Sequence, residues 1–125
     1  LKSIMLSNFK IIDVNERSAS GTSYVGFITE DYSTLVEVFG PPTYDQPSGD
    51  NKVHTEWNLE FAVQEEGEEE LEYVVATIYD WKEESANVAR TTPKYQWHVG
   101  GFNKFDALEC ISQRILDHFK QFGNK

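Results

Sequence analysis

The sequence has few of the residues that covalent cross-links or membrane insertion require. A single cysteine, Cys110, excludes an internal disulfide framework. No apolar run approaches the ~20 residues of a membrane-spanning helix, so no contact with a membrane is expected. The stretch 1–15 has a basic start but lacks the apolar core and small-residue cleavage site of a secretion signal. We therefore expect a reducing, cytoplasmic compartment.

Recognisable catalytic motifs are also missing. The sequence contains no GxGxxG or GxxxxGKS/T phosphate loop, no HExxH or CxxC metal pattern and no GxSxG nucleophile. His54, His98 and His118 are widely separated, and no spacing indicates a metal site. Cys110 has no predictable histidine partner and fits a buried structural cysteine. We therefore predict that the protein is not an enzyme and uses neither a metal nor a cofactor.

Positive charge is scarce in the middle of the chain. Between Asp31 and Glu84 there are 15 acidic residues and only two bases, Lys52 and Lys82. The whole chain has a formal charge of −10. Such a surface repels the phosphate backbone of nucleic acids. The charge distribution thus argues against direct nucleic-acid binding and favours a protein partner with a basic surface.

What the chain does have is enough apolar and aromatic material for one core. Hydrophobic residues make up 39% and aromatic residues 14% of the sequence, which is too many for a disordered chain. A length of 125 residues fits one compact core and is too short for two. We therefore predict a single domain over residues 1–125.

Alternating and helical patterns predict five strands and two helices. The predicted elements are strands at 9–15 and 23–30, a helix at 32–39, strands at 54–63, 71–81 and 95–99, and a helix at 104–122. The polar stretch 16–22 predicts a hairpin between the first two strands, and the composition of 82–94 predicts a loop. The order β-β-α-β-β-β-α predicts an α+β two-layer domain, with both helices packed on a mostly antiparallel sheet.

Several local signals define these elements. Gly40 and the two prolines after it end the short helix, whereas Asn103 is the predicted N-cap of the last helix and Gly123 closes it. The strand at 71–81 is apolar on both faces and is therefore the predicted central strand. The apolar stripe of the last helix is predicted to comprise Phe105, Leu108, Ile111, Ile115, Phe119 and Phe122.

The most unusual segment is QEEGEEELEYVV at 64–75, at the predicted turn of a hairpin. Six carboxylates surround one glycine, from Glu65, Glu66, Glu68, Glu69, Glu70 and Glu72. A turn needs a glycine and polar residues, so ~3 acids would satisfy folding alone. The segment is either a solvated hairpin tip or a surface that binds a basic protein groove. In the second case Glu83 and Glu84 would extend the acidic patch, and Trp81 would be its aromatic anchor.

The aromatic residues suggest a competing class of function. Trp57 and Trp97 fall on predicted core faces, whereas Trp81 ends a strand before charged residues, where exposure is equally compatible with the pattern. Trp81 and His98 could form a stacking platform for a nucleotide or similar ligand, with Arg90 and Lys94 facing its phosphates.

His98 raises a separate question of acid–base chemistry. It lies on the strand face opposite Trp97, where Glu56, Glu60 or Asp80 could approach it. A histidine beside a carboxylate would suit general acid–base work. A half-exposed strand histidine next to a salt-bridge partner explains the same pattern without any chemistry.

Four segments resemble a known group of proteins. The combination of LVEVFGPPT, TEWNLEF, VATIYDWK and YQWHVGG, within residues 30–101, resembles small functionally uncharacterised proteins of bacteriophages and other large DNA viruses. This resemblance implies a viral origin, and hence the cytoplasm of a host cell, but no mechanism. More loosely, a helix ending in VFGPPT followed by the strand TEWNLEF is similar to the unit of the β-lactamase-inhibitor-protein type fold, which presents a sheet face to protein partners.

Three functions are compatible with these features. The first is a small viral binding protein that engages a host or viral protein, such as a nucleic-acid-processing or defence factor, by charge mimicry through the acidic hairpin. The second is a ligand-binding module or small enzyme built on the aromatic sheet face. The third is a structural virion component, recognisable as a symmetric oligomer. A flat acidic face would favour the first, and a concave pocket that joins the bases to Trp81 or His98 would favour the second.

Overall fold

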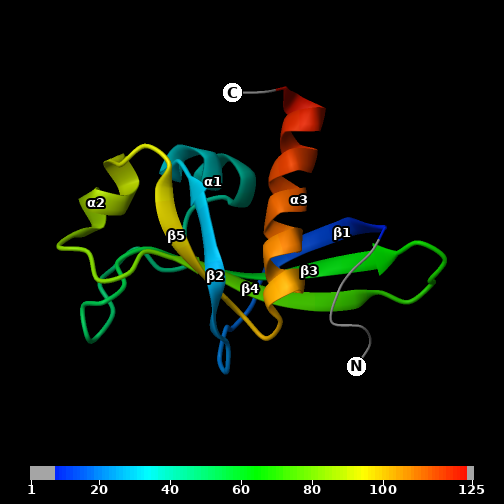
Figure 1. The fold of residues 1–125 in the computed structure, drawn as a ribbon, viewed down its shortest axis with the longest axis horizontal. Coiled ribbons are helices and arrows are strands. Elements are labelled where there is room, and N and C mark those ends of the chain that lie inside the picture. Colours follow the sequence, from blue (N-terminus) through cyan, green and yellow to red (C-terminus); the bar gives the residue numbers. More distant parts are fainter. Residues whose placement is uncertain (1–7, 124–125) are drawn as a thin grey trace.

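The computed structural model describes residues 8–123, which form one sheet with helices packed against it (Figure 1). The elements in chain order are β1 (Phe9–Glu16), β2 (Ser23–Glu30), α1 (Tyr32–Phe39), β3 (Glu56–Glu65), β4 (Glu72–Tyr79), α2 (Ala86–Thr91), β5 (Tyr95–Gly101) and α3 (Lys104–Phe122). All neighbouring strands are antiparallel. The predicted α+β class, with five strands, a short first helix and a long last helix on the sheet, is confirmed.

The prediction of a loop over 82–94 is wrong for the six residues of α2, which lie between β4 and β5. Such a short helix shows too little apolar periodicity to be recognised, and its only buried residue is Ala89. The hydroxyls of Thr91 and Thr92 donate to carbonyl oxygens one turn earlier, which satisfies groups at the helix end. The observed order is therefore β-β-α-β-β-α-β-α.

The predicted hairpin between the first two strands is also wrong. The strand order in the sheet is β1-β3-β4-β5-β2, so β1 and β2 are the two edges and run in the same direction. Glu16 and Ser23 lie at opposite ends of one cross-strand row that passes through β3, β4 and β5. Four strand spacings amount to roughly 19 Å, and the seven peptide links between the two residues reach about 25 Å. The polar stretch 17–22 thus crosses the sheet instead of turning back.

The centre of the sheet follows the prediction. The antiparallel hairpin of β3 and β4 pairs Trp57 with Ile78 and Phe61 with Val74, and β4 is the middle strand. β4 is paired with β5 only over Ala76–Tyr79, so the first half of β4 belongs to a narrower, three-stranded part of the sheet. In Figure 1 this part, made of β1 and the β3–β4 hairpin, extends beyond α3 to the right.

The core lies between one face of the sheet and helices α1 and α3. β3 contributes the alternate residues that its pattern predicted, namely Trp57, Leu59, Phe61 and Val63. From α3, the fully buried side chains are those of Ala107, Cys110 and Ile111. Phe105 and Phe122, both predicted in the apolar stripe, are instead exposed. They lie in the first and last turns of the helix, whereas its fully buried side chains lie between positions 107 and 111.

The two predicted ends of α3 are confirmed. The Asn103 side chain accepts a hydrogen bond from the Asp106 backbone N–H at 3.1 Å, and Gly123 closes the helix with φ of 91°. None of the helices described between residues 8 and 123 combines the length and apolar character that a membrane span requires.

The side of the sheet opposite the core, the helix-free face, positions the candidate sites. Its cross-strand rows include Glu56, Tyr79 and His98 in one row, and Asn58 and Thr77 in the next. None of the described helices packs there; the crossing segment 17–22 and the loop before β3, residues 40–55, cover part of it instead. Asn58 and Thr77 are consequently buried although they lie outside the main core.

Candidate functional site

The acidic tip, residues 65–72, is an ordered turn at the end of the β3–β4 hairpin. Gly67 has a φ of 84°, a left-handed conformation that costs glycine little. The Gln64 side chain donates to the backbone oxygens of Glu68 at 3.1 Å and of Glu69 at 3.3 Å, which folds the turn back over the end of β3. The tip therefore presents its charges from a defined backbone.

Residues 66–70 are all exposed, and residues 66–69 border a hollow of about 590 Å³ between the tip and the start of β1. Among the residues that the structure describes, Glu66, Glu69 and Glu70 form no ion pair. Lys10 is the basic residue that lines the hollow. Several exposed carboxylates on the ordered backbone of a projecting hairpin give a strong local negative potential.

An aromatic residue that the sequence pattern did not assign to a site lies beside the acidic tip. Tyr73 is 61% exposed, and its strand partner is Ala62, so its ring stands on the helix-free face. The neighbouring Leu71 is also exposed. β4 pairs with β5 only from Ala76 onward, so at Tyr73 its only neighbouring strand among those described is β3. The alternation of residues along β4 predicted which face of the strand Tyr73 lies on, but it did not predict whether that face is covered.

Trp81, Glu83 and Glu84, predicted to extend the acidic patch, lie at the other end of β4. Its eight residues separate them from the tip by roughly 25 Å. Glu83 accepts a hydrogen bond from the Tyr95 hydroxyl, and burial together with this bond raises the pKa of Tyr95. Glu84 is exposed. The acidic tip and the Trp81 end are thus separate surfaces.

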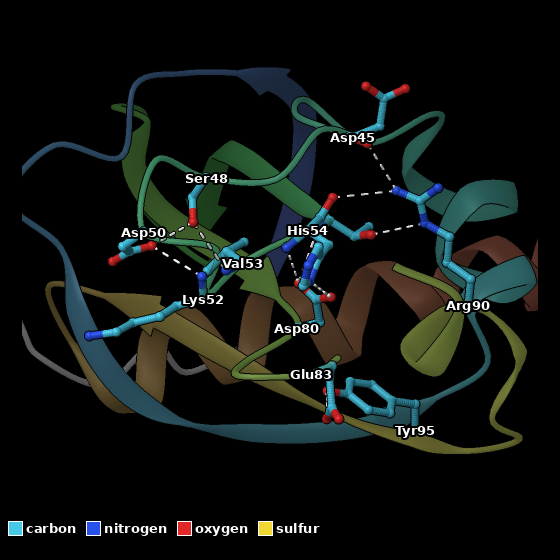
Figure 2. A network of polar contacts seen from close by, with 11 residues as sticks. Asp45, Ser48, Asp50, Lys52, Val53, His54, Asp80, Glu83, Arg90 and Tyr95 are labelled. Carbon is cyan, nitrogen blue, oxygen red and sulfur yellow. Dashed lines mark hydrogen bonds and ion pairs between the residues drawn. The ribbon is translucent and has the colours of Figure 1, made fainter. Parts of the chain in front are cut away.

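Arg90, predicted to face a ligand phosphate, is bound within the fold instead (Figure 2). Its Nε donates to Thr55 Oγ1 at 2.9 Å, and its Nη2 donates to the backbone oxygens of Asp45 at 3.3 Å and His54 at 3.4 Å. The guanidinium also lies 5.5 Å from the centre of the Tyr32 ring. Arg90 therefore joins α2 to the loop before β3.

Lys94 also has structural partners. Its backbone N–H donates to Asp31 Oδ1 at 2.7 Å, and its Nζ lies 3.4 Å from Glu30 Oε1. These contacts fix the start of β5 beside the end of β2. The structure consequently does not bring Arg90 and Lys94 together with Trp81 in one pocket.

Asp80 anchors the loop before β3 from the end of β4. Its side chain is completely buried, and Oδ1 accepts from the backbone N–H groups of His54 at 2.7 Å and Thr55 at 3.0 Å (Figure 2). Oδ2 lies 3.5 Å from His54 Nδ1, a long contact. The carboxylate thus satisfies two buried donors at a chain turn, which is a structural role.

His98 lies in an aromatic cluster on the helix-free face. Its ring centre is 4.9 Å from that of Tyr24, 5.6 Å from that of Tyr79 and 5.9 Å from that of Trp81. Burial lowers the pKa of His98, which favours its neutral form near pH 7. Within residues 8–123 no ion pair joins His98 to a carboxylate. The acid–base pair that the pattern allowed for this histidine is therefore not assembled.

Two adjoining hollows lie beside Trp81. Their volumes are about 510 and 480 Å³, and one lies under the loop before β3 while the other lies on the helix-free face. The residues that line both are Tyr44, Val53, Glu56 and Trp81. Every charged residue in the two linings is acidic, namely Asp45, Asp50 and Glu56. The two bases of the acidic half of the chain, Lys52 and Lys82, lie over the Trp81 ring, with Nζ 5.9 and 5.6 Å from its centre.

Cys110 is expected to be inert in the folded protein. Its side chain is fully buried in the core, and burial, with the nearby charges of Asp106 and Glu109, raises its pKa to about 12. Iodoacetamide should modify the native protein at least ~100-fold more slowly than the protein unfolded in urea, because reaction needs an opening of the core. Intact-mass analysis over time gives both rates. Equal rates would show that α3 does not shield the thiol.

No group of three or more histidine, cysteine or carboxylate side chains converges as a metal site in the part of the chain that the structure describes. Comparison of the chain with models of protein families, with curated proteins and with solved structures finds no match.

Proposed function

We propose that this protein is a binding protein, not an enzyme, and that its acidic tip engages a basic surface of a protein partner. The observation that carries the proposal is the row of exposed carboxylates at residues 66–70, which stands on the ordered backbone of a projecting hairpin. A flexible tip would lose conformational entropy on binding, whereas an ordered one is already close to its bound form. Electrostatic attraction would speed the encounter and make it sensitive to salt.

Tyr73 is the aromatic anchor that this proposal assigns, in place of the distant Trp81. Tyr73 is highly exposed and adjoins the acidic tip. Its ring can supply the apolar contact with a partner that the charged residues of the tip cannot supply. Interfaces typically combine one or a few buried aromatic residues with a polar rim. Glu66, Glu69 and Glu70 would form part of that rim.

The class of partner follows from the charge and from the resemblance to viral proteins. A row of carboxylates on an ordered hairpin is similar in charge to a phosphate backbone. We propose a nucleic-acid-processing or defence factor of a host cell, met in the cytoplasm, as the partner. Since Arg90 and Lys94 are bound within the fold, the phosphate-binding pair of the competing ligand-binding hypothesis has no support from the geometry.

Changing Glu66, Glu69 and Glu70 to glutamine is expected to weaken binding of the partner by roughly 3- to 150-fold, because each exposed charge pair contributes about 0.2–1 kcal/mol and three pairs are lost. The matched control changes Glu16, Glu84 and Glu109 to glutamine, since these are also exposed and remove the same charge elsewhere. Host lysate would be passed over all three immobilised proteins, and each partner would then be purified for affinity measurement.

Tyr73→Ala provides a second arm and should mainly raise the dissociation rate, whereas the three glutamines should mainly lower the association rate. Two results together would contradict the proposal. The native and control proteins would bind the partner as well in 0.5 M salt as at low salt, and the tip variant would bind as well as the native protein. The acidic tip would then be only a solvated hairpin. Light scattering on the native protein would test the third function, since a symmetric oligomer is the sign of a virion component.

A further inference from the structure

Beyond this proposed function, we propose that the hollow beside Trp81 on the helix-free face binds a guanidinium group. The residues that would bind it are Glu56, Asn58, Tyr44 and Tyr79. The site is independent of the acidic tip, from which it is separated by the length of β4. The guanidinium could belong to an arginine side chain of a polypeptide or to a free small molecule, and the chemistry of recognition is the same for both.

Glu56 is a partly buried carboxylate without an ion-pair partner in the part of the chain that the structure describes. Among residues 8–123 no lysine, arginine or histidine forms an ion pair with it. Burial raises the pKa of Glu56, a hydrogen bond with the Asn58 side chain acts in the opposite direction, and the charge of Asp80 raises it further. Burying a carboxylate without a cation is unfavourable. A ligand that brings the missing positive charge would remove this penalty.

Two tyrosines flank Glu56 as direct neighbours in the backbone. Tyr44 is joined to Glu56 by a reciprocal pair of hydrogen bonds, with N···O distances of 3.0 and 2.9 Å. On the other side, Tyr79 is the partner of Glu56 in β4. Directly opposed residues of antiparallel strands place their side chains on the same face. The carboxylate therefore stands between two aromatic rings, and all three residues line the hollow on the helix-free face.

Asn58 supplies a second acceptor in the same hollow. Its side chain is only 5% exposed, and its Oδ1 is buried with no hydrogen-bond partner among the described residues. The backbone N–H of Asn58 donates to Thr43 Oγ1 at 2.9 Å, which fixes the residue in place. A buried amide oxygen normally has a donor. The hollow thus presents a partly buried carboxylate next to a buried amide oxygen that lacks a donor among the described residues.

A guanidinium matches this combination better than other groups. It is planar, carries five N–H donors and one positive charge, pairs with carboxylates in a bidentate manner and stacks on aromatic rings. The charged lining residues are all acidic, so they attract a cation and repel phosphate. Because Lys52 and Lys82 already lie over the Trp81 ring, the incoming cation is expected to stack on Tyr44 or Tyr79.

The test is a nuclear magnetic resonance titration of the full ¹⁵N-labelled chain with Nα-acetyl-arginine methylamide. We expect shifts of the Asn58 side-chain amide and the Trp81 indole, with a Kd of about 1 mM for so small a ligand. Trp57 and Trp97 serve as internal references, because their indole N–H groups are bonded to Gly40 and Glu30 inside the core. The matching citrulline derivative, equal in shape but uncharged, should not bind.

The source of the guanidinium is distinguished with agmatine. Tighter binding of the capped arginine assigns the site to a polypeptide arginine, and tighter binding of agmatine assigns it to a free small molecule. Glu56→Gln should weaken either ligand by at least ~10-fold, whereas Glu84→Gln should have no effect. Equal binding of the citrulline derivative, absence of any shift at Asn58 and Trp81, or an affinity unchanged by Glu56→Gln would overturn the proposal, whatever the acidic tip does.

Stability measurements show whether Glu56→Gln acts on binding or on folding. The raised pKa means that protonated Glu56 favours the native state, so its contribution is fully present below the unfolded pKa and is lost as the pH rises through the folded pKa. Glutamine resembles the protonated form at every pH. The urea midpoint of Glu56→Gln should therefore match that of the native protein near pH 3.5 and exceed it at pH 7. A lower midpoint at pH 7 would make Glu56 a structural residue and overturn the proposal.

Discussion

Replacement of Asp80 by alanine is expected to lower the free energy of unfolding by about 3 kcal/mol. The carboxylate is completely buried, and its Oδ1 accepts hydrogen bonds from the backbone N–H groups of His54 and Thr55. Alanine leaves both donors buried and unpaired, and each such donor costs about 1–3 kcal/mol. Urea denaturation at pH 7, followed by circular dichroism, measures the difference.

Asp80→Asn is the matched control for this prediction. Asparagine keeps a carbonyl oxygen where Oδ1 accepts the two N–H groups, and it removes a buried negative charge that acts on Glu56. Its cost should therefore stay below about 1 kcal/mol. If alanine and asparagine were equally destabilising, the charge of Asp80 and not its hydrogen bonds would hold the loop before β3. If neither changed stability, that loop would contribute nothing to the folded state.

Trp97→Ala is expected to destabilise the protein by about 4 kcal/mol, more than Asp80→Ala. The ring is fully buried, its centre lies 5.5 Å from that of Trp57 and 4.9 Å from that of Tyr95, and both contacts are edge-to-face. Its Nε1 also donates to the Glu30 backbone oxygen at 2.9 Å, which would lose this donor. The substitution thus creates a cavity and removes a hydrogen bond that joins β5 to the end of β2.

Trp81→Ala removes the same side chain from the surface and serves as the control. Trp81 is only partly buried and packs against Tyr79 and His98 on the helix-free face. Its loss should cost less than about 1 kcal/mol. Equal losses for the two tryptophans in urea denaturation would show that the aromatic cluster around His98 is part of the main core.

The two proposed sites use the rigid β3–β4 hairpin in different ways. The acidic tip lies beyond the part of the sheet that α3 covers, where charge is exposed and contributes little to folding. Glu56 and Asn58 lie at the other end of β3, where polar groups are buried at a cost. Variants at the tip should therefore change binding alone, whereas variants in the hollow should change binding and stability together.

The sequence by itself determined the elements whose signals are local. The helical spacing and caps of 32–39 and 104–122 predicted α1 and α3 with the observed bounds. The alternation of apolar and polar residues over 54–63 predicted which face of β3 is buried. The next strand, β4, is apolar on both faces, which predicted its central position in the sheet. These features depend on residues within a few positions of one another, so side-chain periodicity is sufficient to predict them.

Only the tertiary structure decided which distant residues meet. A polar stretch with one glycine can turn back or cross a sheet, so 16–22 did not reveal that β1 and β2 are opposite edges. The charge of Arg90 suggested a ligand, but its partners, 35 to 45 positions away, place it inside the fold. Tyr44 lies in a loop without periodicity, and its pairing with Glu56 follows from loop closure. Such contacts depend on the free energy of the whole packed chain, which local patterns do not contain.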